Sequence, residues 1–170
     1  MSDPSLTLRD GCLLIDETGE VIHPALTAWA FEQLQLVKDA KYHEGTHTAT
    51  VNLGLKHIFG QAFTIAFVFQ KSRLCSAELS LHFDDPAKDK PWDYEIELER
   101  KKAHETWCQR MLGRPLEPMK GFEQWERQAE IQHLLTFPWG SLRSIYDSKG
   151  GFSYLALRYE EPAKDASATT

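Results

Sequence analysis

Two histidines and a glutamate stand at a spacing that can do metal chemistry. Residues 43–47 read His-Glu-Gly-Thr-His, the H-E-x-x-H pattern of zinc-dependent proteases. On a helix, this spacing places His43 and His47 one turn apart as zinc ligands, with Glu44 as the general base. Gly45 and the β-branched residues that follow it favour a strand instead, where the two histidines would lie roughly 13 Å apart. We therefore expect no shared zinc ion, and we keep a zinc-dependent hydrolase only as an alternative.

A second group of candidate residues is acidic. Asp84, Asp85 and Asp89 belong to a charged loop that follows a predicted strand. Such a loop could bind a cation, but it lacks the ligand pattern of an EF-hand. Loops on a rigid scaffold commonly carry binding residues. We therefore predict that these three aspartates contribute to a partner-binding surface.

The next segment, 95–102, is rich in glutamate and ends in basic residues. Its carboxylates could do acid–base chemistry. On a helix, however, the pattern favours a solvated face, with Glu97 and Lys101 paired four residues apart. We add Glu97 to the predicted partner-binding surface.

Other catalytic signatures are missing from the sequence. It contains no G-x-S-x-G nucleophile elbow, no phosphate-binding P-loop and no dinucleotide glycine fingerprint. Cys12, Cys75 and Cys108 are widely spaced and form no C-x-x-C pair, so we expect reduced thiols. We predict that the protein is not an enzyme and carries no metal and no cofactor.

Composition and charge indicate which kinds of partner the protein can bind. The 170 residues carry 19 Lys and Arg against 25 Asp and Glu, a net charge of −6. An acidic surface repels phosphates, which argues against nucleic-acid binding and suits a basic protein partner. The first residues lack the basic and apolar regions of a secretory signal, and no apolar run approaches the roughly 18 residues of a membrane span. We expect a cytoplasmic protein with no membrane partner.

Strand patterns are the clearest structural signal. Phe63, Ile65, Phe67 and Phe69 alternate with smaller residues, which predicts a strand with one face in the core. We expect further strands over 47–53, 77–83, 139–147 and 152–159, and an N-terminal hairpin over 6–15 around Asp10-Gly11.

Two helices are expected between these strands. Apolar residues recur at helical spacing over 24–38, and segment 91–112 has Pro at its start and Gly just past its end. The second helix should bury Ile96, Ala103, Trp107 and Met111. The pattern predicts an α+β fold, with a mostly antiparallel sheet built from hairpins and two main helices packed on it. We expect a single domain over 1–161 and a disordered tail over 162–170.

The second half of the chain resembles a bacterial family. It contains Phe137-Pro138-Trp139-Gly140, then Ile145-Tyr146-Asp147-Ser148-Lys149-Gly150-Gly151, then a strand that ends Arg158-Tyr159. Before these, Pro91-Trp92 opens a charged helix that carries Trp107 and ends Met111-Leu112-Gly113. Across residues 60–160, these motifs resemble small α+β bacterial immunity proteins, which are encoded beside secreted toxin effectors of type VI or other contact-dependent systems.

The resemblance implies an immunity protein that neutralises a cognate, cytoplasm-acting toxin by stoichiometric binding. Proteins of this kind act by binding, so the resemblance implies no catalytic residue. An acidic immunity protein suits a basic toxin, such as a nuclease. A protein-binding adaptor with no role in immunity remains open as an alternative, beside the zinc-dependent hydrolase.

Overall fold

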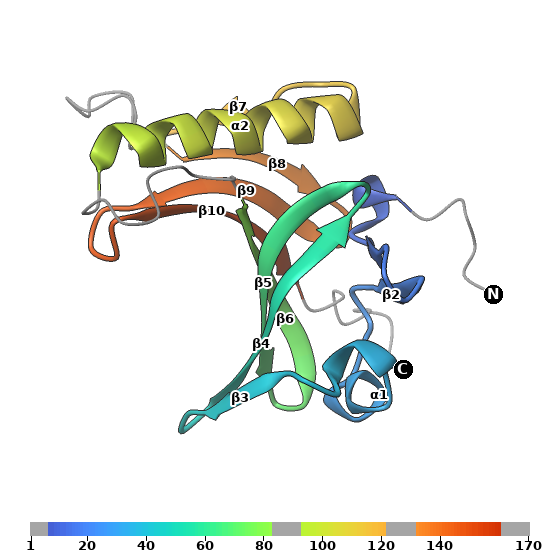
Figure 1. Cartoon of the computed structure of the whole chain (residues 1–170). Helices are drawn as coiled ribbons and strands as arrows, with labels where there is room; N and C mark the ends of the chain where they lie inside the picture. Colours follow the sequence, from blue (N-terminus) through green and yellow to red (C-terminus); the bar gives the residue numbers. More distant parts are fainter. Residues whose placement is uncertain (1–6, 83–92, 122–131, 161–170) are drawn as a thin grey trace, which may run out of the picture.

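A computed structural model of the chain describes residues 7–82, 93–121 and 132–160. Over these residues the chain forms one ten-stranded sheet with helices packed on it (Figure 1). All the strand pairs in this sheet are antiparallel. The predicted α+β class is therefore confirmed.

The elements follow one another in a simple order, where η marks a 3-10 helix. They are η1 (Leu8–Asp10), β1 (Leu13–Ile15), β2 (Glu20–Ile22), α1 (Ala28–Glu32), η2 (Gln35–Val37), β3 (Lys41–Glu44), β4 (Thr48–Ile58), β5 (Gln61–Gln70), β6 (Arg73–Leu81), α2 (Tyr94–Leu112), β7 (Glu117–Pro118), β8 (His133–Phe137), β9 (Gly140–Asp147) and β10 (Phe152–Tyr159). The strand order in the sheet is β2-β1-β4-β5-β6-β10-β9-β8-β7, and β3 pairs with part of β4.

Strand β5 lies at the centre of the core, and its predicted alternation is confirmed. Phe63, Ile65 and Phe67 are fully buried, and Phe69 is nearly so. The turn to β6 is tight, because Lys71 and Ser72 both adopt positive φ angles, of 49° and 62°. The strands predicted on either side of β5 appear as β4 and β6.

Both helical parts of the fold pack on the same face of the sheet. The ring of Phe31 in α1 contacts Phe67 and Phe69, with centroids 5.3 and 5.0 Å apart. The ring of Trp107 in α2 contacts Phe63 at 4.9 Å. Because these residues of β5 share one face, α1 and α2 lie on one side of the sheet, and Figure 1 shows the opposite side free of both.

Helix α2 confirms the described part of the helix predicted over 91–112. The Asp93 side chain accepts a hydrogen bond from the backbone N–H of Glu95 at its start, and Gly113, with φ of 71°, ends it. Of the predicted buried stripe, Trp107 is buried, Ala103 and Met111 are partly buried against the core, and Ile96 is partly buried. The side chains that the helix buries most deeply are Glu97, Lys101, His104, Trp107, Cys108 and Leu112.

The helix predicted over 24–38 is shorter and broken in two. Thr27 caps α1 by accepting from the backbone N–H of Ala30. The break has a physical cause: the carboxylate of Glu20 accepts the backbone N–H groups of Gln35 and Leu36, at 2.6 and 2.9 Å. Because these two N–H groups bind Glu20, they are not bonded to carbonyls of the preceding turn as a continuous helix would require. Helix α1 therefore ends before them, and η2 begins as a separate helix.

The hairpin predicted over 6–15 is also wrong. Residues 8–10 form η1, because Thr7 and Asp10 cap each other in a capping box. Gly11, with φ of 74°, then ends this turn. Strand β1 pairs with β2 instead of with the preceding residues.

The strands predicted over 139–147 and 152–159 are confirmed as the hairpin β9–β10. The Trp-Gly pair at its start has a structural reason. A Cβ atom on Gly140 would lie 1.9 Å from the carbonyl oxygen of Arg158, so only glycine fits. The indole of Trp139 covers Gly11, where an added Cβ would lie 2.6 Å from the ring.

Three hydrogen bonds join distant parts of the chain at this point, and we call them the clasp. The Tyr159 hydroxyl donates to the Gly11 carbonyl at 3.0 Å. The Trp139 indole N–H donates to the Arg9 carbonyl at 2.7 Å. The Arg9 guanidinium donates to the carbonyl of Leu112, at the end of α2.

Replacing Phe67 by alanine should cost about 3–5 kcal/mol of the free energy of unfolding, because the ring is fully buried against Phe31. Val68→Ala, on the other face of the same strand, is the matched control and should cost much less. Urea unfolding of both variants measures the difference. Equal midpoints for Phe67→Ala and the unchanged protein would contradict the core assignment.

Candidate binding surfaces

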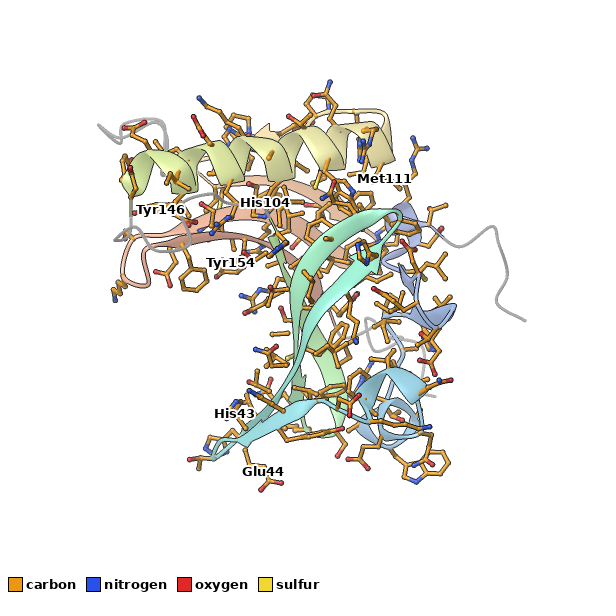
Figure 2. The ribbon with its side chains drawn as sticks, viewed as in Figure 1. His43, Glu44, His104, Met111, Tyr146 and Tyr154 are labelled. Atoms are coloured by element: carbon orange, nitrogen blue, oxygen red, sulfur yellow. The ribbon has the colours of Figure 1, made fainter. Side chains whose placement is uncertain are left out.

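The H-E-x-x-H segment lies on a β-hairpin, as its β-branched residues predict. His43 and Glu44 belong to β3, and the backbone N–H of Gly45 donates to the Thr48 carbonyl at 2.7 Å to close the turn into β4. Figure 2 shows His43 and Glu44 near the end of this hairpin, where both are exposed. The helical arrangement that a zinc protease needs is therefore not formed. Over the described residues, no group of three or more His, Cys, Asp and Glu side chains gathers as a metal site.

Of the four predicted partner-binding residues, the structure describes only Glu97. Asp84, Asp85 and Asp89 lie outside the described residues. Glu97 is 6% exposed and points into the protein. Its carboxylate accepts from the backbone N–H of Ser153 at 2.7 Å and pairs with Arg100. The solvated position expected for Glu97, and its pairing with Lys101, are therefore wrong.

Glu97 belongs to a buried polar layer between α2 and the sheet. The Ser153 hydroxyl donates to the Glu97 carbonyl at 2.7 Å. The backbone N–H of Leu81 donates to Nε2 of His104 at 2.8 Å. Nδ1 of His133, on β8, lies 2.9 Å from Nζ of Lys101. These contacts engage Glu97, Lys101 and Nε2 of His104, so α2 can turn its polar side to the sheet. Nδ1 of His104 and the indole N–H of Trp107 are buried without a hydrogen-bond partner among the described residues.

Sequence reasoning missed this layer, although a signal exists. Glu97, Lys101 and His104 recur at i, i+4 and i+7, the spacing of one helix face. Polar residues at that spacing normally face water. Their partners on β6, β8 and β10 are more than 20 residues away in sequence, so the pattern alone does not reveal the burial.

The layer also contains the residue types of a hydrolytic triad. Nδ1 of His133 lies 3.0 Å from a carboxylate oxygen of Glu105, and Ser144 is paired with His133 across β8 and β9. A triad needs a serine hydroxyl that is bonded to the imidazole and open to substrate. The Ser144 hydroxyl is fully buried and has no hydrogen-bond partner. The three groups do not form a nucleophilic site in this arrangement.

Carboxylates of the N-terminal segment also serve the fold. Asp16 accepts from the backbone N–H of Gly60 at 2.7 Å, and Glu17 accepts from that of His57 at 2.9 Å. Burial acts to raise the pKa of Glu17, but the hydrogen bonds from the His57 side chain and from backbone groups outweigh it, and the pKa is lowered. With Glu20, these carboxylates bind backbone donors of loops, strands and η2.

An acidic ridge remains on the outer side of α2. We define the acidic ridge as Asp93, Glu95 and Glu99, all of them exposed. Glu95 and Glu99 are four residues apart and share one side of the helix. The ridge directly follows the segment that carries the three predicted aspartates.

The sheet presents a second surface, which we call the open face: the side turned away from α1 and α2. Cross-strand pairing gives its middle row as Asn52, Ala66, Glu78, Ala156 and Arg143. The neighbouring row is Thr50, Val68, Ser76, Arg158 and Ser141. No helix among the described residues packs on these rows, and Figure 2 shows Tyr154 on the same side, away from α2.

The open face carries a compact group of charged and hydroxyl side chains. The Nε–H of Arg143 donates to the Ser141 hydroxyl at 3.0 Å. A guanidinium nitrogen of Arg158 lies 3.6 Å from a carboxylate oxygen of Glu78. Burial raises the pKa of Tyr154, and Glu78 adds to this effect, while Arg158 partly opposes it.

Neither the family models, nor the curated proteins, nor the solved structures give a match. In the described parts of the chain, no helix is long and apolar enough to cross a membrane. The geometry itself defines an α+β protein with an acidic ridge on its long helix and an open sheet face.

Elemental analysis should find no stoichiometric zinc in the purified protein, because the hairpin does not bring His43 and His47 together as helix neighbours. His47→Ala is the control variant. One zinc per chain that is lost in this variant would contradict the prediction.

Acid should weaken the fold through His104. Burial lowers the pKa of its imidazole to about 3, and the charges of Arg100 and Lys101 act in the same direction. Below an unfolded pKa of about 6.5, the unfolded chain therefore binds a proton that the folded chain does not. Stability should fall from about pH 6.5 towards pH 3, by up to about 1.4 kcal/mol per pH unit from this group.

His104→Gln tests this prediction, because glutamine can accept the same backbone hydrogen bond and does not titrate. Urea unfolding should be measured between pH 7.5 and 4.5. As the pH falls, the free energy of unfolding of the variant should rise relative to that of the unchanged protein. His47→Gln, at an exposed position, is the matched control. Parallel pH profiles for His104→Gln and the unchanged protein would contradict the assignment.

Proposed function

We propose that the chain is an immunity protein that neutralises a cognate, cytoplasm-acting toxin by stoichiometric binding. The observation that carries the proposal is the acidic ridge. Its side chains are exposed, whereas Glu97 is buried and the carboxylates of Asp16, Glu17 and Glu20 accept backbone N–H groups. The ridge therefore places three exposed carboxylates at the start of one helix, where that of Asp93 also caps the helix.

This charge suits a basic toxin. Complementary charges at the rim of an interface mainly raise the association rate and make it sensitive to salt. Asp84, Asp85 and Asp89 precede the ridge in sequence, and we include them among the proposed partner-binding residues. The resemblance of residues 60–160 to immunity proteins supports the same proposal.

The ridge also has a purely structural explanation. Negative side chains near a helix N-terminus stabilise the helix, typically by 0.3–1 kcal/mol each at the surface. A stability measurement must therefore accompany any binding measurement on ridge variants.

A protein-binding adaptor is the second candidate. The open face supports it, because it differs in character from the ridge and could accept a different partner. An immunity protein protects cells from a toxin, whereas an adaptor does not, so a survival assay separates the two candidates.

The first test is co-expression with the protein encoded beside the gene for this chain. We expect the neighbouring protein to be toxic alone, and we expect co-expression to restore growth and to yield a 1:1 complex. A toxic neighbour that neither binds this chain nor is neutralised by it would contradict the proposal.

The second test measures association rates with that toxin at low and high salt. The triple change of Asp84, Asp85 and Asp89 to asparagine should slow association and weaken its salt dependence, as should the double change of Glu95 and Glu99 to glutamine. Glu32→Gln with Asp39→Asn, at exposed positions of the N-terminal segment, is the matched control. Unchanged rates at both salt concentrations would place the interface elsewhere.

A further inference from the structure

A hollow lies beside α2, where the start of β5 and the end of β6 meet the helix. Its volume is about 510 Å³, within the range of ligand pockets. Gln61 of β5, with Leu81 and His82 at the end of β6, lines one side of the hollow, and α2 lines the other. In Figure 1 the turn between β4 and β5 lies below the C-terminal half of α2, next to this place.

The deepest part of the hollow is apolar and belongs to the core. The side chains of Leu81 and Trp107, which both line it, are 7% and 3% exposed. The Trp107 ring is held in place by its contact with Phe63. The Thr106 hydroxyl already donates to the Lys102 carbonyl at 2.9 Å, so its methyl group is left for further contacts. A large apolar side chain in the hollow would remove this apolar surface from water, which is favourable.

The hollow is continuous with the acidic ridge along one side of α2. Glu99 of the ridge is followed by the lining residues Ala103, Thr106 and Arg110 at i+4, i+7 and i+11, the spacing of one helix face. Ala103 lies one turn after Glu99, about 6 Å along the helix axis. A protein interface of standard size is much wider than one helix turn. A protein partner that places basic residues over the ridge therefore also covers the hollow.

Arg110 determines which kind of side chain suits the hollow best. It is exposed, and it lines the end of the hollow that is farther from the ridge. A guanidinium group stacks on the face of an aromatic ring and gains no such interaction from an aliphatic side chain. An entering ring can also pack against the indole of Trp107, as aromatic pairs do. The lining therefore favours an aromatic side chain over an aliphatic one.

We propose that the hollow is an anchor pocket, which receives an aromatic side chain of the toxin next to the basic residues that face the ridge. This inference rests on the proposed immunity function and adds a second part to its interface. Interfaces commonly combine a buried aromatic anchor with a polar or charged rim. In this arrangement the ridge mainly sets the association rate, and the hollow mainly sets the dissociation rate.

The first test needs no toxin. N-acetyl-tryptophanamide, an uncharged analogue of a tryptophan residue, is titrated into the isotopically labelled protein and followed by NMR. We expect saturable binding in the millimolar range, with shifts of the backbone amides of Gln61, Leu81 and Ala103. N-acetyl-leucinamide should bind several-fold more weakly. Equal binding of the two compounds, or no saturable shifts at these amides, would overturn the proposal.

Three substitutions on α2 locate the binding. Thr106→Phe should fill the hollow, whereas Gln109→Phe, at an exposed position that does not line it, is the matched control. Thr106→Phe should raise the Kd for N-acetyl-tryptophanamide roughly tenfold, and Gln109→Phe should leave it unchanged. Arg110→Gln, which does not fill the hollow, should raise the Kd about two- to fivefold through the lost stacking. Equal effects of the two phenylalanine substitutions, or an unchanged Kd in Arg110→Gln, would contradict the assignment.

The toxin complex tests the division of roles between the ridge and the hollow. Thr106→Phe should raise the dissociation rate roughly tenfold and leave the salt dependence of association unchanged, in contrast to the change of Glu95 and Glu99 to glutamine. If the toxin binds, but Thr106→Phe and Gln109→Phe dissociate from it equally fast, this inference fails and the immunity proposal stands. If the unchanged protein does not bind the toxin, both fail.

Sedimentation of the free protein tests a second copy of the chain as the occupant. We expect a monomer, in the unchanged protein and in Thr106→Phe alike. A dimer that Thr106→Phe dissociates would place a second copy in the hollow and would overturn the inference.

Discussion

The packing of β5 is the constraint on which the rest of the structure depends. Its large apolar residues all face one side, and Phe31 and Trp107 pack against them there. Both helical parts of the fold must therefore lie on that side. The opposite side is left to the small and polar residues that alternate with the core, and these residues form the open face. One alternation in sequence thus decides which side of the sheet the helices cover.

The net charge calculated from the sequence does not show how the charged side chains are distributed over the fold. The net charge of −6 suggests an evenly acidic exterior. The carboxylates of Asp16, Glu17, Glu20 and Glu97 instead accept backbone N–H groups and hold separate segments together. What remains exposed is divided between an acidic helix side and a sheet face that carries charges of both signs. A total charge therefore says little about the partner of any one surface.

Much of the fold could be predicted from local patterns, and the failures share one cause. Strands β4, β5, β6, β9 and β10 follow alternation and turn residues, and α2 follows its end signals, all of which act between near neighbours. The helix expected over 24–38 is broken by Glu20, and the buried side of α2 is chosen by partners on other strands. The H-E-x-x-H segment was placed correctly off a helix because its own residues decide its conformation. The charged group of Arg143, Arg158 and Glu78 on the open face was missed because these residues come together only through the strand order.

The clasp has a consequence for how the protein is made. It ties the carbonyls of Arg9 and Gly11, which leave the ribosome early, to Trp139 and Tyr159, which leave it about 130 to 150 residues later. β10 also separates β6 from β9 in the sheet, so the two halves of the sheet stay unjoined until this strand is synthesised. At typical synthesis rates of about 5–20 residues per second, the edge of β6 stays without its neighbouring strand for several seconds. During that interval the nascent chain exposes an unpaired edge, and protection by a chaperone would have its greatest value there.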